Sequence, residues 1–200
     1  MGKNNETFTI TAALPYANGP IHIGHLAGVY LPADIYARYN RLTDNDVAFI
    51  CGSDEHGVAI SLASRKASIT PKELIDKYDG MIKSSFKEFG ISFDNYSRTS
   101  KKIHHDTSLE LFNLLKEKDL FSLKKSNQYY DTEENQFLAD RYIIGTCPCG
   151  KFDEAYGDQC EKCGTTLSPD ELVNPRSAIS DSSPILKETK HYYIKLNEFE

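Results

Sequence analysis

The fold of this 200-residue chain depends on residues 11–25, which read Thr11-Ala-Ala-Leu-Pro-Tyr-Ala-Asn-Gly-Pro-Ile-His-Ile-Gly-His25. Residues 7–10, immediately before, alternate between polar and apolar side chains and predict the end of a half-buried strand. Two prolines and a glycine within residues 15–20 then interrupt regular structure. From about Ile21 the apolar residues recur at helical spacing as far as Tyr30. The sequence therefore predicts a strand, a loop rich in glycine and proline, and a helix, in that order.

Two histidines lie at the start of the predicted helix. His22 and His25 are three residues apart, so one helical turn places them on the same face. Gly24 between them has no side chain, which lets a ligand approach the backbone closely. The N-terminus of a helix also offers free N–H groups and the positive end of the helix dipole, which together attract phosphate. On spacing alone three interpretations stay open: the histidines bind a metal, stabilise phosphate charge, or only pack.

Composition and charge limit the classes of protein to which this chain can belong. With 40% hydrophobic and 26% charged residues, it has the composition of a globular protein that buries a core. Its formal net charge of −6 is unlike the basic surface that a domain gripping a nucleic-acid backbone usually needs. No apolar run reaches the length of a membrane span, and no signal-like segment follows Met1. We therefore expect a cytoplasmic protein without a membrane partner.

A polar cluster is expected at the carboxyl end of a buried strand. Residues 47–51, Val-Ala-Phe-Ile-Cys, form a continuous apolar run that is typical of a central strand in a parallel sheet. Cys51 in this run is interpreted as a small buried hydrophobe, with a nucleophile as the alternative. Residues 52–57, Gly-Ser-Asp-Glu-His-Gly, follow directly. Ligands bind outside the carboxyl ends of strands in open α/β sheets, so we expect this cluster and the two histidines at one edge. A solvated loop is the alternative interpretation.

Helical periodicity predicts which side chains are buried elsewhere. In the helix expected over residues 26–42, Pro32 should cause a kink or a bulge, or divide it into two helices, because proline removes a backbone hydrogen bond. Residues 70–73, Thr-Pro-Lys-Glu, are a capping box that begins a second helix, and Gly90 ends it. A third helix begins near His104 and His105, which face different directions and should not share a metal. The apolar residues expected to be buried in these helices are Ile35, Tyr36, Tyr39, Leu42, Leu74, Ile75, Tyr78, Ile82, Phe86, Phe89, Leu109, Phe112 and Leu115.

The character of the sequence changes near Lys118. From residue 119 short aromatic segments separated by polar turns predict a β-rich region. It contains two cysteine pairs, Cys147-Pro-Cys149 and Cys160-Glu-Lys-Cys163. Metal binding in a reducing compartment is favoured over disulfides for such a cluster. Four thiolates at this spacing suit one structural zinc ion, with an iron–sulfur cluster as the rival and four free cysteines as the plain alternative.

The first stretch resembles a known family. His22-Ile-Gly-His25 matches the HIGH motif of class I aminoacyl-tRNA synthetases, and the longer run from Ala13 to His25 resembles the methionyl-tRNA synthetases in particular. Residues 52–57 resemble the matching segment of that family, and the resemblance extends over essentially the whole chain. It implies an α/β fold. Residues 1–118 would form the first half of a Rossmann-like nucleotide-binding sheet, and residues 119–200 a β-rich connective insertion that binds zinc.

The resemblance also implies an activity and its residues. The expected reaction is that of a methionine–tRNA ligase, in which ATP, entering with Mg²⁺, activates methionine to methionyl-adenylate before transfer to tRNA(Met). The implied residues are, for catalysis, His22 and His25; for ATP, Tyr16, Asn18, His22, Gly24 and His25; for methionine, Ala13, Leu14, Tyr16 and Asp54; and for zinc, Cys147, Cys149, Cys160 and Cys163. Asp54 corresponds to the carboxylate that binds the amino group of methionine. Arg98, in contrast, is expected to be a surface arginine, with an approach to the substrate as the alternative.

The sequence departs from the family's pattern in one motif and lacks another. The family usually has two residues between the first two cysteines, whereas Pro148 stands alone here, so the first turn around the metal must differ. The Lys-Met-Ser-Lys-Ser-type loop of the family does not occur in the chain. We therefore expect an N-terminal piece of a longer enzyme, inactive by itself. The sequence does not specify the oligomeric state.

Two other functions fit part of the pattern. A small nucleotidyltransferase with an HxGH motif, unrelated to tRNA, would need neither the loop before His22 nor the cysteine pairs. A non-catalytic zinc-dependent binding module would carry the cysteines, but the pI of about 5.5 disfavours nucleic-acid binding by this piece. A methionine-plus-ATP binding assay separates such a module from the enzyme.

Overall fold

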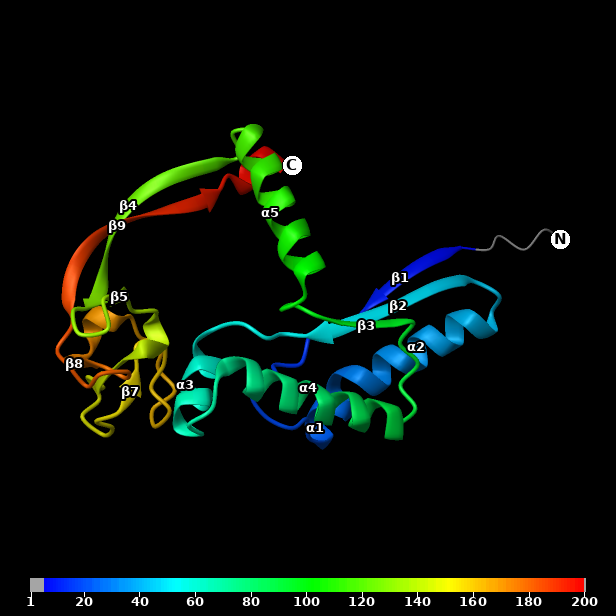
Figure 1. The fold of residues 1–200 in the computed structure, drawn as a ribbon, viewed down its shortest axis with the longest axis horizontal. Coiled ribbons are helices and arrows are strands. Elements are labelled where there is room, and N and C mark those ends of the chain that lie inside the picture. The colour runs from blue at the N-terminus through cyan, green and yellow to red at the C-terminus, as the bar shows by residue number, and fades with distance from the viewer. Residues whose placement is uncertain (1–5, 200) are drawn as a thin grey trace. The chain divides into compact units, whose positions relative to one another are not determined.

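A computed structural model of the chain describes residues 6–199, and Figure 1 shows it as a ribbon. The chain divides into two units that meet between Leu109 and Glu110. This division falls inside a helix, α5 (Lys102–Glu117), whereas the sequence placed a domain boundary just after that helix. The two units are described separately below.

The first unit is built on three parallel strands. The strands β1 (Thr7–Thr11), β2 (Asp46–Ser53) and β3 (Asn95–Arg98) lie side by side in that order (Figure 1). Thr11 pairs with Ile50, and Ser53 pairs with Arg98. The strand predicted over residues 47–51 is confirmed and extends to Ser53. Because all three strands run the same way, the loops after β1 and β2 leave the sheet at one edge, as the sequence predicted.

The helix after the first loop is interrupted in a regular way. It consists of α1 (Ile23–His25), a π-helical turn η1 (Leu26–Tyr30) and α2 (Leu31–Leu42). The Leu31 N–H donates to the carbonyl of Leu26, five residues back, where an α-helix would bond four residues back. Pro32 follows at once and has no N–H to donate to the carbonyl four residues before it. The predicted bulge near Pro32 is confirmed as this π-helical turn.

The buried face of α2 differs from the prediction. Its apolar stripe is exposed, and the residues that face inward are Asp34, Ala37 and Asn40. Asp34 is accommodated because its carboxylate accepts hydrogen bonds from the Ser92 N–H and from Nε of Arg38, each at 2.6 Å. A polar side chain with such partners can take a buried position that periodicity assigns to an apolar one. The prediction of buried side chains at the following positions was therefore wrong: Ile35, Tyr36, Tyr39 and Leu42.

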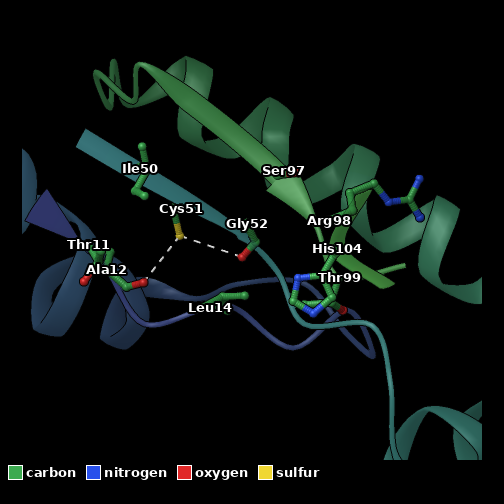
Figure 2. A pocket seen from close by; sticks show the side chains of 10 residues that line it. All are labelled: Thr11, Ala12, Leu14, Ile50, Cys51, Gly52, Ser97, Arg98, Thr99 and His104. Atoms are coloured by element: carbon green, nitrogen blue, oxygen red, sulfur yellow. Dashed lines mark hydrogen bonds between the residues drawn. The ribbon is translucent and has the colours of Figure 1, made fainter. Parts of the chain in front are cut away.

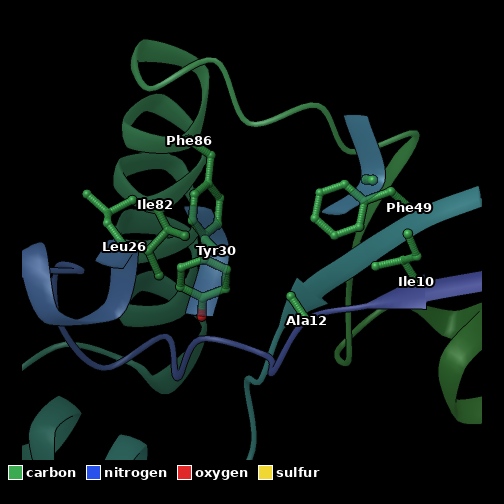
Figure 3. Close-up of a cluster of buried hydrophobic side chains, with 8 residues drawn as sticks. Ile10, Ala12, Leu26, Tyr30, Phe49, Ile82 and Phe86 are labelled. Atoms are coloured by element: carbon green, nitrogen blue, oxygen red, sulfur yellow. The ribbon is translucent and has the colours of Figure 1, made fainter. Parts of the chain in front are cut away.

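One face of the sheet is covered by the first helix segments and by α4 (Pro71–Glu88), which follows α3 (Val58–Lys66). Figure 3 shows the resulting cluster, in which the rings of Tyr30 and Phe86 meet edge to face with centroids 4.6 Å apart. The buried members of the cluster are Ile10, Ala12, Leu26, Tyr30, Ala37, Phe49, Ile82 and Phe86. The Tyr30 hydroxyl also donates to the carbonyl of Ala13, at 3.0 Å, so the core holds the start of the first loop.

The ends of α4 agree with the predicted signals. Thr70 and Glu73 form the capping box, and Gly90 takes a left-handed conformation (φ 67°) after the helix. Leu74, Ile75, Ile82 and Phe86 are buried as predicted, and Tyr78 packs against a small cluster in a partly buried position. Phe89 is exposed, contrary to the prediction. Phe89 is the C-cap residue of α4, where the chain turns away from the helix, so its side chain no longer points to the buried face.

The second unit is rich in strands, as predicted. A long antiparallel ribbon pairs β4 (Phe121–Asp131) with β9 (Ile185–Ile194), and the short β5 (Gln136–Phe137) joins it at one end. A separate sheet has the order β7 (Ala155–Tyr156), β6 (Ile143–Thr146), β8 (Val173–Ser177). Single 3-10 turns lie at η2 (Asp140–Tyr142), η3 (Pro169–Glu171) and η4 (Leu196–Phe199). The core of the second unit consists of the buried residues Leu138, Ile143, Cys147, Ala155, Cys160, Leu167 and Leu172.

The helix α5 buries less apolar surface than predicted. Phe112 stacks against Phe121 and meets Tyr192 edge on, with ring centroids 5.0 and 5.7 Å apart. Phe112 and Leu115 are therefore partly buried. Leu109 is 61% exposed and its predicted burial was wrong, because the aromatic residues of the ribbon meet the helix only further along. None of the helices within residues 6–199 is both long enough and apolar enough to span a lipid bilayer.

Candidate functional site

The two histidines of the first motif hold each other at the start of α1. His22 has an extended backbone, and its Nδ1 atom accepts a hydrogen bond from the Gly24 N–H (3.1 Å). In return, the His22 N–H donates to Nδ1 of His25 (3.1 Å), and the ring centroids lie 3.9 Å apart. Because each Nδ1 accepts a backbone N–H, a neutral ring carries its proton on Nε2, which makes Nε2–H its donor to a ligand.

Gly24 has a structural reason to be glycine in this arrangement. A Cβ atom at this position would lie 3.0 Å from Cε1 of His22 and 3.1 Å from its Nδ1. The ring of His22 would have to move, and the hydrogen bond that sets its tautomer would be strained. The sequence interpretation gave Gly24 a different role, the close approach of a ligand.

The loop after β1 and the turn after β2 are joined through backbone hydrogen bonds. Tyr16 and Asp54 form a parallel bridge beyond the ends of the two strands. Within it, the Asp54 N–H donates to the Pro15 carbonyl and the Ala17 N–H donates to the Asp54 carbonyl, each at 2.9 Å. This bridge brings together two residues that the sequence assigned to methionine.

The side chain of Tyr16 is fixed by the same turn. Its hydroxyl donates to the backbone carbonyl of His56. Gly57 has φ 116°, and a Cβ atom there would collide with the Tyr16 hydroxyl. Gly57 is therefore needed both for the shape of the turn and for the seat of the tyrosine. The Asp54 carboxylate, by contrast, makes no hydrogen bond or ion pair with any group in residues 6–199.

A pocket of about 220 Å³ opens beside this edge of the sheet (Figure 2). Its lining comes from the ends of β1, β2 and β3 and from the start of α5. Leu14 lines it, whereas Ala13, Tyr16 and Asp54 do not. The full lining is Thr11, Ala12, Leu14, Ile50, Cys51, Gly52, Ser97, Arg98, Thr99 and His104.

Two lining residues bear on the sequence interpretation. The Cys51 thiol lies 3.7 Å from the Ala12 carbonyl, and burial raises its pKa, so it is a poor nucleophile and fills space as predicted. His104 was not assigned to any site from the sequence, since no spacing pattern links it to the first motif. Its ring lies 6.5 Å from that of His105, which instead places Nε2 3.2 Å from Nε2 of His56.

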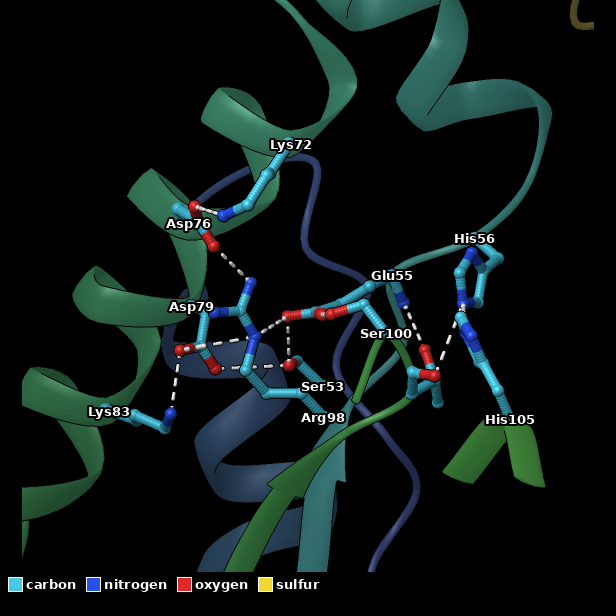
Figure 4. Close-up of polar contacts among 11 residues, drawn as sticks. Ser53, Glu55, His56, Lys72, Asp76, Asp79, Lys83, Arg98, Ser100 and His105 are labelled. Carbon is cyan, nitrogen blue, oxygen red and sulfur yellow. Dashed lines mark hydrogen bonds and ion pairs between the residues drawn. The ribbon is translucent and has the colours of Figure 1, made fainter. Parts of the chain in front are cut away.

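A network of charged side chains surrounds Glu55, the residue after Asp54 (Figure 4). Arg98 is only 18% exposed, and its Nε atom lies 2.6 Å from the carboxylate of Glu55, whose side chain is fully buried. The expectation that Arg98 is a surface arginine was therefore wrong. Two buried acceptors on α4 and at the end of β2 explain why the side chain turns inward. The sequence marked Glu55 only as a member of the polar cluster 52–57, and it did not connect this residue with Arg98.

The four clustered cysteines are brought together in the second unit. Their Sγ atoms all lie within 4.8 Å of one another, and those of Cys147 and Cys163 are 3.9 Å apart. A tetrahedral zinc ion with Zn–S bonds of about 2.3 Å places sulfurs about 3.8 Å apart, so the spacing fits. Hydrogen bonds with Thr165 lower the pKa of the Cys163 thiol to about 6. The Cys149 N–H lowers the pKa of the Cys147 thiol, but burial and hydrogen bonds with the other three cysteines outweigh this effect and raise that pKa to about 12.

Each cysteine pair sits on its own turn. Gly150 and Gly164 follow the pairs with φ 68° and 75°, and their N–H groups donate to the carbonyls of Cys147 and Cys160. The short first pair is accommodated because the Cys149 N–H points at Sγ of Cys147, at 3.5 Å. The single proline between the first two cysteines thus leaves the four sulfurs close enough for one ion.

Comparison with known proteins gives a consistent result. The family described as "tRNA synthetases class I (M)" matches residues 8–200. A methionine–tRNA ligase of Flavobacterium johnsoniae is 62% identical over 199 residues, which is 100% of this chain and 28% of that protein. One from Bacteroides fragilis is 61% identical over 200 residues, again 100% of this chain and 30% of its own length. The chain thus spans less than a third of these two relatives.

Solved structures support the fold. A methionyl-tRNA synthetase of Mycobacterium tuberculosis in complex with methionyl-adenylate superposes with a TM-score of 0.65 at 22% identity, over 97% of this chain and 33% of that one. A leucyl-tRNA synthetase (LeuRS) of Agrobacterium radiobacter, solved in a ternary complex with tRNA, gives 0.64 at 20% identity, over 98% and 21%. The predicted α/β class with a parallel, Rossmann-like sheet is confirmed.

Proposed function

The chain belongs to the family of class I tRNA synthetases of the M type, and from this premise we propose that it supplies part of a methionine–tRNA ligase. In this proposal residues 1–118 form the first half of the catalytic domain and residues 119–200 a connective insertion. The substrates are methionine, ATP with Mg²⁺, and tRNA(Met). The observation that carries the proposal is the reciprocal pair of His22 and His25 at the same sheet edge as Asp54.

The first step proposed is adenylate formation. A carboxylate oxygen of methionine attacks the α-phosphorus of ATP, the bond from that phosphorus to the bridging oxygen breaks, and pyrophosphate leaves with the electron pair. Negative charge builds up on the phosphate oxygens in the transition state. The Nε2–H groups of His22 and His25 then act as donors to that charge, already oriented by their Nδ1 hydrogen bonds. Asn18, which is exposed in the same loop, is a further candidate for phosphate contact.

The proposed methionine site is formed by the first loop together with the turn after β2. The Asp54 carboxylate pairs with the ammonium group of methionine, for which the lack of a competing partner within residues 6–199 leaves it available. Ala13, Leu14 and Tyr16 line the same edge and contact the amino acid. The fixed hydroxyl of Tyr16 holds its ring in one orientation. The second step then transfers the methionyl group to the terminal ribose of tRNA(Met), with AMP as the leaving group.

The zinc ion proposed is structural. Cys147, Cys149, Cys160 and Cys163 would hold it, and it would supply cross-links between the two turns rather than chemistry on a substrate. The sulfur spacing and the two glycine turns support this assignment over free thiols. The iron–sulfur rival is separated from zinc by metal and sulfide analysis of the purified chain.

Methionine-dependent exchange between pyrophosphate and ATP tests the proposal. The chain would be joined to the part of the Flavobacterium johnsoniae relative that the match leaves uncovered, and exchange compared with methionine, with leucine and without amino acid. We expect exchange with methionine alone, and a loss of about 10²–10³ in rate for His22→Asn. Exchange that is independent of the amino acid would reject the methionine assignment.

A further inference from the structure

Glu55 is the most deeply buried charged group beside the candidate methionine site. Its side chain is fully buried, and both carboxylate oxygens are engaged. One oxygen accepts from the Ser53 hydroxyl (2.7 Å) and from Nε of Arg98 (2.6 Å), and the other accepts from the Ser100 hydroxyl. The backbone N–H of Glu55 donates to the Thr99 hydroxyl at 2.9 Å. A residue next to Asp54 in the chain is thus fixed from every side.

Arg98 connects Glu55 to helix α4, and the ion pair of Glu55 and Arg98 is called the anchor below. One guanidinium nitrogen, Nη2, donates to Asp76 (2.7 Å), and Nε lies 3.7 Å from Asp79. Asp79 also accepts from the Ser53 hydroxyl at 3.1 Å. Lys72 and Lys83 complete the cluster by pairing with Asp76 and Asp79, so three carboxylates face three cations. The mostly buried members, Glu55, Arg98 and Asp79, are held by ion pairs and by the Ser53 hydroxyl that both carboxylates share, which favours one geometry.

The protonation state of the anchor follows from these contacts. Burial by itself would raise the pKa of Glu55, but the hydrogen bonds from Ser100 and Ser53, with Arg98, outweigh it and bring the pKa below its usual value. Glu55 is therefore ionised at neutral pH. Glu55 and Arg98 therefore form an ion pair with one charge-assisted hydrogen bond, from Nε of Arg98, while Nη2 of the same guanidinium donates to Asp76.

Asp54 connects the first loop to Glu55. Its backbone N–H and carbonyl are taken by Pro15 and Ala17 of the first loop, and the next residue is the buried Glu55. Neighbouring residues of an extended chain direct their side chains to opposite sides. Fixing the Glu55 side chain behind the turn therefore fixes where the Asp54 carboxylate emerges in front of it.

We propose that Glu55 and Arg98 are positioning residues for methionine: their ion pair holds the turn that presents Asp54 to the ammonium group. This inference rests on the proposed function and names residues that it did not include. The histidine pair makes its hydrogen bonds within residues 22–25 and does not use the anchor. The positioning role therefore predicts an effect on methionine that ATP does not share, whereas a purely structural role would affect both substrates together.

The test uses the chain joined to the uncovered part of the Flavobacterium johnsoniae relative, and measures KM for methionine and for ATP in pyrophosphate exchange. Glu55→Gln keeps the side-chain volume but removes the charge. Arg98→Lys keeps the charge but removes the planar guanidinium that donates to Glu55 and Asp76 at once. We expect KM for methionine to rise about 10²-fold in each, as small misplacements of a binding group do, with KM for ATP within about twofold. The double variant should be no worse than the worse single one, because both changes break the same pair.

A matched control is available in the same unit. Lys102 and Asp106 form an exposed ion pair on α5, and Lys102→Gln removes it without touching the network. We expect that variant to keep both KM values. Should Glu55→Gln fail to fold, Ser100→Ala removes one hydrogen bond from the anchor and should still raise KM for methionine several-fold.

The outcomes separate the two proposals. Equal changes in both KM values, or no change in either, would overturn the positioning role while leaving the methionine activity in place. If the unmodified protein shows no exchange with methionine, the proposed function fails instead. A rise confined to ATP would also overturn the positioning role.

Discussion

The two units of the chain fix their candidate sites in opposite ways. In the first, the contacts join residues far apart in sequence: Tyr16 bonds to a residue 40 positions away, and Arg98 to one 43 positions away. In the second, all four cysteines fall within a span in which the ends, Cys147 and Cys163, are 16 positions apart. The geometry of the first site therefore depends on the packed sheet and helices. The geometry of the second depends on two local turns and on whatever the sulfurs bind.

The two units also differ in how they hold a buried carboxylate. Glu55 in the first unit is paired with an arginine, whereas Asp131 in the second is buried with no ion pair within residues 6–199. Asp131 instead accepts from the backbone N–H groups of Glu133 and Glu134, at 2.9 and 3.0 Å, and from the Ser180 hydroxyl at 2.6 Å. The first unit holds its buried acid with a cation, and the second holds its own with two nearby backbone N–H groups and with a serine hydroxyl 49 positions away.

Metal removal is expected to have the largest effect and to separate the two units. Structural zinc contributes about 10–16 kcal/mol to small zinc domains, so stripping zinc from the chain should unfold the region around the cysteines. In hydrogen exchange, amides of residues 143–177 should lose protection while those of β1, β2 and β3 keep theirs. Cys160→Ser should behave like the stripped chain, and Cys51→Ser should bind zinc normally. Equal loss of protection in both units would show that they are not independent.

The histidine pair should give the next largest effect, confined to chemistry. His25→Asn removes the ring that accepts the His22 N–H, and the loss of a donor to phosphate charge should lower the rate of adenylate formation by about 10²–10³. Single-turnover measurement in the extended protein would isolate this step. Zinc content and hydrogen-exchange protection of the second unit should not change. A variant that lost zinc along with activity would contradict the separation described above.

Asp131 allows the stability of the second unit to be tested by pH. Burial would raise its pKa, but hydrogen bonds from Ser177 and Ser180 and from two backbone N–H groups lower it below the ordinary value. A carboxyl with a lowered folded-state pKa contributes stability above its unfolded pKa of about 3.9, and loses it as pH falls through the folded value. Asp131→Asn should therefore cost about 1–3 kcal/mol near neutral pH, and the difference from the parent should shrink in acid. Denaturant unfolding of the parent and of Asp131→Asn at several pH values, with hydrogen exchange as the readout for the second unit, measures this difference in stability.

Two glycines give the smallest expected effects and the most direct comparison. Gly57→Ala would put a side chain on a backbone with positive φ, and its Cβ atom would collide with the Tyr16 hydroxyl. We expect it to lower the free energy of unfolding by about 1–3 kcal/mol. Gly164 has φ 75° but nothing within 4 Å of an added Cβ atom, so Gly164→Ala should cost only about 1 kcal/mol. Urea melts of both variants measure the difference. Equal costs would mean that the Tyr16 hydroxyl gives way and is not firmly seated.

The sequence predicted the features that short patterns encode. The parallel strand over residues 47–51, the capping box at Thr70, the bulge near Pro32 and the gathering of the cysteines each depend on a few neighbouring residues. The same local logic failed for α2, because Asp34 gains partners from Ser92 and Arg38 that a helical stripe does not reveal. It failed for Leu109, whose helix meets the ribbon only further along.

The anchor around Glu55 shows the limit most clearly. Arg98 has the ordinary appearance of an exposed arginine, since its partners lie on α4 and just after β2, far away in the chain. Only a parallel sheet that places β2 beside β3 brings Arg98 to Glu55. A charge network that joins three elements leaves no spacing pattern in the sequence, so it is found from the fold or not at all.

The π-helical turn at Leu26–Tyr30 gives the chain tolerance to changes in length. Such a turn holds one residue more than an α-helical turn, because its hydrogen bond spans five residues in place of four. An insertion or deletion of one residue at this point changes the winding of a single turn. The histidines before it keep their mutual hydrogen bonds, and Ala37 after it keeps its place against the sheet. A change of one residue in this turn would therefore leave both the reacting groups and the packed residues beneath them in place.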